Sequence, residues 1–589
     1  MDGVKRLHTA APLLLELDLT EPLIDAPPTD PLGWAQARRH ASLRAVLDGL
    51  TDAADDPRVR GLIAKIGGRM SLVRAQDIAA AVGRFRRSGK PAVAWAETFG
   101  EFGPGTVSYL LATAFEQVWL QPSGDVGLTG VAVEATFLRG VLDRVGVEPQ
   151  LGQRHEYKNA ADQLMRRDFS DAHREAAGRL AESALEQVVA GVSAGRGLSL
   201  ERVRELVDQA PLPAAAALEA GLVDRLGYRD EVYAYVRERV GDDAELRYVS
   251  RYERPGLAAG VAGTAGRSDL AGRVGDAGRQ VLTGVLGPRG EALLRRLPRR
   301  SDGVVALITG SGAVQQGRGR RSPLGGGSGL GSDQVSAAFR SAVRDPKVKA
   351  IVFRVDSPGG SYIASDVIWR EVRQARAAGI PVVVSMGDLA ASGGYFVSMA
   401  ADVIVARPGT LTGSIGVFGG KAVTAGLLDR IGVGHDAVIA GRNARMFSSR
   451  RPFDDGEWQR LNDWLDRVYA DFVTKVADGR GMTWDEAHDR ARGRVWTGAD
   501  AKERGLVDEL GGLHRAAELA RERAGLSADA ELRRWPASSP LDWLATPKSS
   551  EDRTAVTGYQ AGWGSFADLA SRLGLPADGP LTMPGLRLV

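Results

Sequence analysis

A serine in a turn of small residues is the first group in this sequence that could do covalent chemistry. Ser392 lies within the run Gly-Asp-Leu-Ala-Ala-Ser-Gly-Gly-Tyr at 387–395, directly after an apolar run and before a helix-like run at 396–400. Such a turn, at the carboxyl end of a parallel strand, presents a hydroxyl at the sheet edge where α/β proteins build their sites. Ser392 is therefore a candidate nucleophile for acyl transfer, although the same residues could form only a tight strand–helix turn.

Glycines near this serine could supply backbone donors for an oxyanion. Gly393 leaves the N–H after the serine accessible, and preorganised N–H groups stabilise the charge that develops in acyl transfer. A second glycine turn, Gly359-Gly360, follows the apolar run at 351–355 and could direct another N–H to the same point. The candidate oxyanion residues are therefore Gly393, Gly359 and Gly360.

A serine hydroxyl also needs a base that removes its proton. The seven histidines include none in a recognisable triad context, and Gly-x-Ser-x-Gly is absent around Ser392. The other common base is a lysine kept neutral by burial, because desolvation lowers the pKa of an ammonium group. Lys421 is the lysine nearest to Ser392 in sequence and Lys158 lies far upstream. The residues by themselves do not choose between these two.

Short apolar runs alternate with helix-like stretches and would position these side chains. In the second half of the chain the apolar runs lie at 304–308, 351–355, 381–385 and 403–405. Between them the pattern predicts helices at 332–344, with Ser332 as N-cap, and at 364–377. Further upstream, the alternation from Leu15 to Leu19 predicts a strand. Strands of about five apolar residues between helices indicate an α/β fold with a mostly parallel sheet covered by helices.

The sequence also repeats itself. The three matches pair Asp56-Pro57 with Asp345-Pro346, Leu142–Val147 with Leu428–Val433, and Gly221–Asp224 with Gly505–Asp508. The offsets are 289, 286 and 284 residues, in the same order along the chain. A nearly constant offset is the signature of a tandem duplication. We therefore predict two α/β domains of related fold, at 1–248 and 303–530.

Two segments lie outside the copies. Residues 249–302 are rich in Gly, Ala and Arg, and apolar residues recur among arginines between 270 and 300. This stretch could lie on a membrane surface as a basic amphipathic segment, but its many glycines favour a solvated linker. The tail at 531–589 holds tryptophans among Pro, Ser and Gly, and the pattern predicts no function for it.

The composition excludes several kinds of functional site and partner. The chain has 589 residues, 44% hydrophobic, and no cysteine, which excludes disulfides, thiolate metal sites and Cys nucleophiles. A net charge of +3 is too small to predict a nucleic-acid partner. No apolar run reaches the 18 or so residues that cross a bilayer, and the N-terminal run is too short and acidic for a signal peptide. These features predict a cytoplasmic or peripheral membrane protein.

Four motifs together resemble the signal peptide peptidase A family, also called protease IV, the long duplicated form of the S49 serine peptidases. The motifs lie at 388–395, 356–361, 412–417 (Thr-Gly-Ser-Ile-Gly-Val) and 495–499 (Val-Trp-Thr-Gly-Ala). The resemblance covers both copies, about 500 residues. It implies two tandem domains of the Clp-protease and crotonase type.

The resemblance also implies a Ser–Lys dyad, with the serine from the C-terminal copy and the lysine from the N-terminal copy. The nucleophile is then Ser392. The run Glu-Tyr-Lys-Asn-Ala-Ala-Asp at 156–162 is similar to the family's Tyr-Lys-x-Ala motif and makes Lys158 the base. Shifted by 286 residues, Ser392 falls on Thr106 and Lys158 falls on Ala444, so each copy keeps one group. Thr106 is a rival nucleophile that lacks the Ser-Gly-Gly context.

The implied activity is a serine endopeptidase acting on apolar or unfolded peptides, cleaved signal peptides among them, with no metal or nucleotide cofactor. The resemblance also implies a homo-oligomer, a tetramer in long members. Family members commonly carry an N-terminal membrane anchor, and this sequence shows no such helix.

Two other functions compete with this one. A crotonase-like acyl-CoA enzyme would share the sheet and the glycine turns, and would turn over an acyl-CoA while ignoring peptides. A non-catalytic scaffold of the same fold would leave Ser392 unlabelled by a serine-reactive probe.

Overall fold

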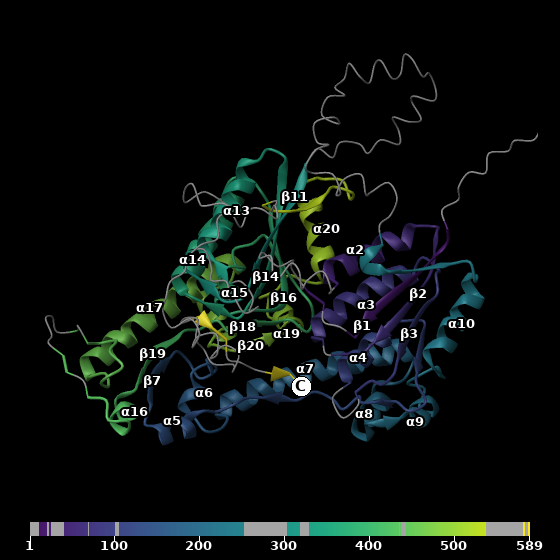
Figure 1. The fold of residues 1–589 in the computed structure, drawn as a ribbon. Helices are drawn as coiled ribbons and strands as arrows, with labels where there is room; N and C mark the ends of the chain where they lie inside the picture. Colours follow the sequence, from purple (N-terminus) through teal and green to yellow (C-terminus); the bar gives the residue numbers. More distant parts are fainter. Residues whose placement is uncertain are drawn as a thin grey trace, which may run out of the picture. The chain divides into compact units, whose positions relative to one another are not determined.

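The computed structural model describes residues 11–20, 23–24, 41–68, 70–100, 105–252, 303–317, 329–434, 436–437, 443, 445–536, 581–583 and 587–588. The chain divides into two compact units (Figure 1). Unit one joins Met1–Met70, Ala75–Thr129 and Gly191–Asp302, and unit two joins Ser71–Arg74, Gly130–Ala190 and Gly303–Val589. The candidate membrane segment 270–300 lies outside the described residues.

Unit one is built on a six-stranded parallel sheet in the order β10-β1-β2-β3-β4-β9. Its strands are β1 (Leu13–Leu19), β2 (Val59–Ile66), β3 (Ala92–Ala96), β4 (Gln117–Leu120), β9 (Arg225–Leu226) and β10 (Glu245–Tyr248). A small antiparallel pair joins β5 (Asp125–Val126) and β8 (Leu212–Pro213). The helices are α2 (Leu43–Asp55), α3 (Leu72–Arg86), α4 (Thr106–Ala112), α8 (Leu200–Gln209), α9 (Ala214–Glu219) and α10 (Arg229–Val240).

Unit two is built on an eight-stranded sheet whose main path is β20-β18-β16-β14-β11-β22, with β17 on β16 and β21 on β17. Its strands are β11 (Val304–Ser311), β14 (Val348–Ser357), β16 (Val382–Ala391), β17 (Val403–Ala406), β18 (Leu411–Gly413), β20 (Val495–Thr497), β21 (Glu509–Leu510) and β22 (Leu532–Arg534). Every pairing is parallel except that of β18 with β20. The predicted α/β fold with mostly parallel sheets is confirmed.

Helices cover both faces of this sheet. The helices of the second copy are α13 (Ser332–Arg344), α14 (Tyr362–Ala377), α15 (Gly393–Phe396), α16 (Ala425–Arg430), α17 (Asp455–Arg480), α18 (Trp484–Arg490), α19 (Gly498–Glu503) and α20 (Leu513–Arg523). Alternate residues of β14 enter different cores: Ile351 and Phe353 pack with α13, α14 and α17, whereas Ala350 and Val352 pack with α20. A strand buried on both faces must be apolar throughout, which explains why each run could be predicted from its composition.

The segment 130–190 belongs to unit two, although it precedes the second copy by more than 100 residues. It contains β6 (Val133–Glu134), α5 (Arg139–Val145), β7 (Glu148–Gln153), α6 (Asp162–Met165) and most of α7 (Asp171–Arg196). β7 pairs antiparallel with β19 (Phe418–Val423). The domain bounds drawn from the repeat stay a prediction about the duplication, and these compact units follow different bounds.

Very short strands complete unit two. One small sheet has the order β13-β12-β15-β23, from Leu330–Gly331, Val314–Gln315, Gly359–Gly360 and Leu581–Thr582. A further strand, β24 (Arg587–Leu588), pairs with β6. The predicted N-cap at Ser332 is wrong. Gly331 is the N-cap, because the Ser332 hydroxyl instead accepts the Gly317 N–H at 3.1 Å.

None of the helices within the described ranges is both long and apolar enough to cross a membrane.

Candidate active site

Ser392 is held in a strained turn between β16 and α15. Its backbone has φ 54° and ψ −113°, a conformation that costs a non-glycine residue free energy. Two hydrogen bonds fix this turn: the Ser392 N–H donates to the Gly413 carbonyl of β18 at 2.7 Å, and the Phe396 N–H donates to the Ser392 carbonyl at 2.9 Å. The strain and the fixed backbone aim a fully buried hydroxyl from the end of a central strand.

Lys158 reaches the same place from the loop after β7. Its side chain is fully buried. The loop lies against two glycines: a Cβ on Gly493 would come within 2.5 Å of the Lys158 backbone nitrogen, and a Cβ on Gly416 within 3.2 Å of its Cδ. Any larger residue at 493 would push the lysine loop outward. The His155 carbonyl accepts the Lys158 N–H at 3.4 Å and closes the turn.

The two side chains are within hydrogen-bonding distance of each other. Lys158 Nζ lies 2.8 Å from Ser392 Oγ, 2.9 Å from the Ser414 carbonyl oxygen and 3.1 Å from Ser414 Oγ. Burial lowers the pKa of Lys158 well below its ordinary value, because desolvation penalises the ammonium form. The described site therefore favours the neutral amine.

Three oxygens surround Nζ, and the neutral amine that burial favours would meet them with two N–H donors and one lone pair. The Ser414 carbonyl can only accept, so one N–H points there, and the second reaches Ser414 Oγ. The lone pair then faces Ser392 Oγ, whose hydrogen can point toward it. This is the orientation in which an amine can take a proton from a hydroxyl.

The candidate oxyanion glycines lie next to the serine. A Cβ on Gly393 would stand 3.0 Å from Gly359 Cα and 3.0 Å from the Gly360 nitrogen, so β15 passes close to the residue after Ser392. The Gly359 N–H donates to Ser357 Oγ at 3.2 Å. Gly359 has φ 103° and Gly360 φ 151°, which favours glycine at both positions. Since the Gly359 N–H already has an acceptor, Gly360 is the better candidate for the second donor.

The rival residues have other surroundings. Lys421 Nζ donates to the Met446 carbonyl at 2.8 Å and lies 4.0 Å from the ring centre of Phe453. Thr106 is the first residue of α4 and belongs to unit one, whereas Ser392 and Lys158 both belong to unit two. Of the two lysines that the residues left open, Lys158 is the one whose amine approaches Ser392.

The described histidines near this loop join aromatic clusters. His155 and His488 pack edge to face, 4.8 Å between ring centres, and the Tyr469 hydroxyl lies 2.9 Å from His488 Nδ1. His173 packs against Phe169 with ring centres 4.6 Å apart. The side chains of these three histidines thus contact aromatic rings. The structural role of His155, whose carbonyl holds the lysine turn, had no signal in the sequence.

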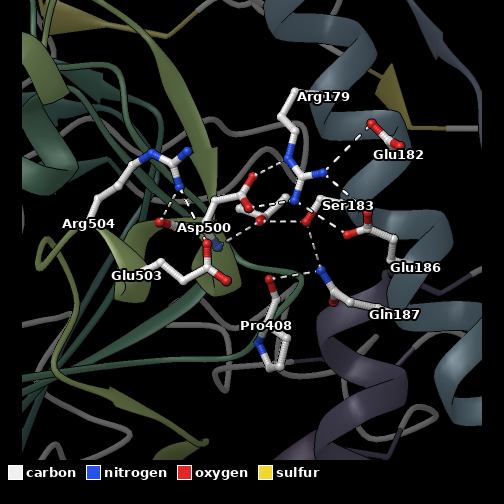
Figure 2. A network of polar contacts seen from close by, with 10 residues as sticks. Arg179, Glu182, Ser183, Glu186, Gln187, Pro408, Asp500, Glu503 and Arg504 are labelled. Atoms are coloured by element: carbon white, nitrogen blue, oxygen red, sulfur yellow. Dashed lines mark hydrogen bonds and ion pairs between the residues drawn. The ribbon is translucent and has the colours of Figure 1, made fainter.

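Polar contacts anchor α7, the helix that follows the lysine loop, to the serine-bearing part of unit two (Figure 2). The Arg179 guanidinium binds Asp500 with two bonds of 2.7 and 3.1 Å, and Asp500 is almost fully buried. The hydroxyls of Ser183 and Thr497 lie 2.8 Å apart, and Thr497 ends β20. β20 pairs with β18, which bonds the backbone of Ser392. Sequence reasoning missed this network, which positions both halves of the candidate dyad.

A second set of polar contacts braces the lysine loop itself. The Tyr157 hydroxyl donates to Glu175 on α7 at 2.5 Å, and Arg494 donates to the same carboxylate at 2.8 Å. On the other side of the loop, Arg492 pairs with Glu156. These contacts hold the residues on both sides of Gly493 against the segment that carries Lys158.

The fold and the candidate site together define the class of protein. An α/β protein with a strained serine at a strand end, a buried amine on its hydroxyl and glycine turns beside it has the parts of a serine-type peptidase. The model of peptidase family S49 matches residues 84–242 and 374–527, one segment in each copy. The chain belongs to peptidase family S49.

Relatives agree with this assignment. The chloroplastic serine protease SPPA of Arabidopsis thaliana is 32% identical over 489 residues, 82% of this chain and 66% of that protein. Protease 4 of Salmonella typhi is 33% identical over 538 residues, 88% of this chain and 80% of that protein. A ClpP1 mutant from Listeria monocytogenes aligns at 15% identity with a TM-score of 0.24 over 36% of this chain and 94% of that chain. Nothing in the family and relative matches supports the acyl-CoA alternative.

Proposed function

We propose that this protein hydrolyses peptide bonds with a Ser–Lys dyad in which Ser392 is the nucleophile and Lys158 the general base. The observation that carries the proposal is the 2.8 Å separation of Lys158 Nζ and Ser392 Oγ inside a fully buried site. Burial supplies the lowered pKa that a lysine base needs, and no second cation is required for it.

The chemistry follows from these groups. The neutral amine of Lys158 takes the hydroxyl proton as Ser392 Oγ attacks the scissile carbonyl carbon. The resulting ammonium gives that proton to the leaving amine, so the peptide C–N bond breaks and an acyl-serine ester remains. Water, deprotonated by the same amine, then attacks the ester and releases the acid. In each step Nζ holds the proton only until it passes to the leaving group, which is the amine in acylation and Ser392 Oγ in deacylation, and Ser414 offers the ammonium two acceptors.

The oxyanion would be stabilised by the N–H groups of Gly393 and Gly360. Both residues lie beside the nucleophile, and the close approach of β15 to Gly393 leaves no room for a side chain. One such donor is worth about 2.7–4 kcal/mol of transition-state stabilisation in other hydrolases. Each of these N–H groups would therefore contribute on the order of 10²–10³-fold to the proposed rate.

Apolar or unfolded peptides, cleaved signal peptides among them, are the proposed substrates. The residues around the nucleophile are small or apolar: Ala391 precedes it and belongs to a cluster with Leu180 and Val495. Extended peptides add a strand to an exposed sheet edge, and apolar pockets select their side chains. Release of a signal peptide supplies an apolar segment of this kind, and that is the substrate the family resemblance implies.

Assembly and location are further parts of the proposal. The assembly rests on resemblance to the family, and the location rests on the hydropathy of the sequence. We propose a homo-oligomer, a tetramer in solution, which light scattering on the purified chain would measure. We also propose a cytoplasmic or peripheral membrane location. Flotation with vesicles, for the full chain and for a chain without 270–300, would detect a membrane role for that segment, and equal fractionation would dismiss it.

The test of the dyad compares three variants of the full chain. Ser392→Ala and Lys158→Met should each abolish turnover of an apolar fluorogenic peptide, whereas Lys421→Met should keep most of it. Lys421 is the matched control, because it is also a buried lysine in unit two and desolvation lowers its pKa as well. Circular dichroism establishes that each variant is folded. Full activity in Lys158→Met would reject the assignment.

The same proteins separate the scaffold alternative. A fluorophosphonate probe should label the parent chain at Ser392 and leave Ser392→Ala unlabelled. A folded parent chain that neither reacts with the probe nor cleaves peptides would favour the scaffold.

A further inference from the structure

The C-terminal residues of the chain form a strand on the candidate oxyanion segment. β23 (Leu581–Thr582) pairs antiparallel with β15, placing Leu581 opposite Gly360 and Thr582 opposite Gly359. The other edge of β15 is taken by β12. The tail therefore occupies the edge to which an extended peptide would add beside Ser392. β23 and β24 are drawn as the yellow arrows in Figure 1.

The ladder directs one tail carbonyl at the candidate oxyanion donor. The Met583 N–H donates to the Pro358 carbonyl at 2.8 Å. Opposed residues in an antiparallel ladder alternate between hydrogen-bonded and non-hydrogen-bonded pairs. Met583 and Pro358 form a hydrogen-bonded pair, so the next pair, Thr582 with Gly359, is not hydrogen-bonded. The pair after it, Leu581 with Gly360, is hydrogen-bonded again. The Gly360 N–H thus faces the Leu581 carbonyl while the tail is in place.

The next residue of the tail fills the apolar surface beside the nucleophile. Met583 is 7% exposed. It belongs to one apolar cluster with Ala391, which directly precedes Ser392, and with Leu180 and Val495; Val133, Leu389 and Leu411 pack against this cluster. Removing a Met side chain from water is favourable through the hydrophobic effect. The tail is therefore held by a side chain as well as by its backbone.

A second contact extends the docked tail. β24 pairs antiparallel with β6, with Arg587 opposite Glu134 and Leu588 opposite Val133. Val133 also packs against the cluster that receives Met583, so the two docking points adjoin. Two short strands bind weakly when separate, but the second binds at a high effective concentration once the first is docked. Both strands belong to unit two, with the dyad.

We propose that the tail segment formed by Leu581–Met583 and Arg587–Leu588 is an intramolecular inhibitor of the peptidase site, lying where an extended peptide substrate must bind. This proposal rests on the proposed function. The contact is non-covalent, and a peptide reaches Ser392 only when the tail leaves β15. The tail thereby lowers the fraction of competent enzyme, and apparent affinity for substrate falls in proportion to that fraction.

Two proline variants of the full chain form the matched test. Leu581→Pro removes the N–H that faces Gly360, whereas Thr582→Pro removes an N–H that points away from β15 and keeps the extended backbone. We expect Leu581→Pro, and likewise Met583→Asp, to raise kcat/KM for a peptide by about tenfold, with Thr582→Pro close to the parent. Equal kcat/KM in Leu581→Pro and Thr582→Pro, or a fall in Met583→Asp, would overturn the proposal.

A binding measurement keeps this test separate from that of the dyad. A fluorescent synthetic peptide of residues 579–589 should bind the folded Met583→Asp, Ser392→Ala double variant, followed by anisotropy, and the same peptide with Asp at 583 should bind at least tenfold more weakly. If the dyad proposal fails, no variant cleaves peptides, yet this binding difference remains. Equal weak binding of the two peptides would overturn the inhibitor proposal whatever the activity.

Discussion

The Ser414 hydroxyl should orient the amine of Lys158, and Ser414→Ala removes it alone. In the neutral amine one N–H points to the Ser414 carbonyl and the other to Ser414 Oγ, at 2.9 and 3.1 Å, which leaves the lone pair for Ser392. Alanine keeps the carbonyl and takes away the second acceptor. The amine can then rotate and donate to Ser392 Oγ, an orientation in which it cannot accept the serine proton.

The size of the expected loss in kcat/KM follows from the acceptor that the amine loses. A buried N–H without an acceptor costs about 1–3 kcal/mol. If the productive orientation bears that cost in the reacting complex, kcat/KM falls about 5- to 150-fold, at about 1.4 kcal/mol per factor of ten. The backbone should change little, because Ser414 has φ 51° and alanine tolerates that region about as poorly as serine does.

The assay is kcat/KM on an apolar fluorogenic peptide across a range of pH. A hydrogen bond to a charged donor is stronger than one to a neutral donor, so Ser414 Oγ stabilises the ammonium of Lys158 more than the amine. Its removal lowers the pKa of Lys158 further, and the acidic limb of the profile should move to lower pH. The rate deficit and the limb shift together identify a positioning role, since misfolding would reduce activity without moving the limb.

The matched control is Ser336→Ala. Ser336 lies on α13, is 2% exposed, and its hydroxyl has no hydrogen-bond partner within the described part of the chain. Losing that hydroxyl should leave kcat/KM and the pH limb unchanged. The reasoning about the lone pair is refuted if folded Ser414→Ala matches the parent in both measurements.

Two more predictions concern the lysine pKa and the α7 anchor. Because burial lowers the pKa of Lys158, kcat/KM should be constant at high pH and should fall as the pH drops through that pKa. Between the lowered and the ordinary pKa the unfolded chain binds one proton more than the folded chain, so the free energy of unfolding should rise with pH across this window. Lys158→Met should abolish that slope in urea titrations. Arg179→Met removes the two N–H donors that Arg179 gives to buried Asp500. Because Arg179 is itself about one-third exposed, the loss should lower the free energy of unfolding in urea by about 2 kcal/mol. Glu182→Gln, at an exposed partner of Arg179, should cost under about 0.5 kcal/mol, and equal costs for the two variants would contradict the anchor.

The central strands were predictable from composition because they are buried on both faces. The predicted run at 351–355 lies within β14, and the runs at 304–308, 381–385 and 403–405 overlap β11, β16 and β17. Two-residue strands such as β15 and β23 are too short for any periodic signal, so their pairing could not be predicted. The same holds for the tail at 531–589, whose composition predicts no function and which supplies β22, β23 and β24.

The site was predictable in part. Ser392 and Gly393 stand in one small-residue turn, and a local motif is visible wherever it occurs. Lys158 comes from a segment more than 200 residues upstream, so only resemblance to a family selected it over Lys421. Gly493, which makes room for the lysine loop, carries no signal by itself, because a glycine in an irregular segment has many uses.

The lysine base depends on how tightly the segment 130–190 is packed. Desolvation is the cause of the low pKa of Lys158, so water that reached Nζ would raise that pKa. The α7 anchor through Arg179 and Asp500 holds the helix that follows the lysine loop, and the Tyr157–Glu175 bond ties the loop to that helix. Loosening the anchor should therefore move the acidic limb of Arg179→Met to higher pH, opposite to the shift of Ser414→Ala. If the acidic limbs of Arg179→Met and Ser414→Ala moved in the same direction, the anchor would act on stability alone. Something other than burial would then set the protonation state of the Lys158 amine.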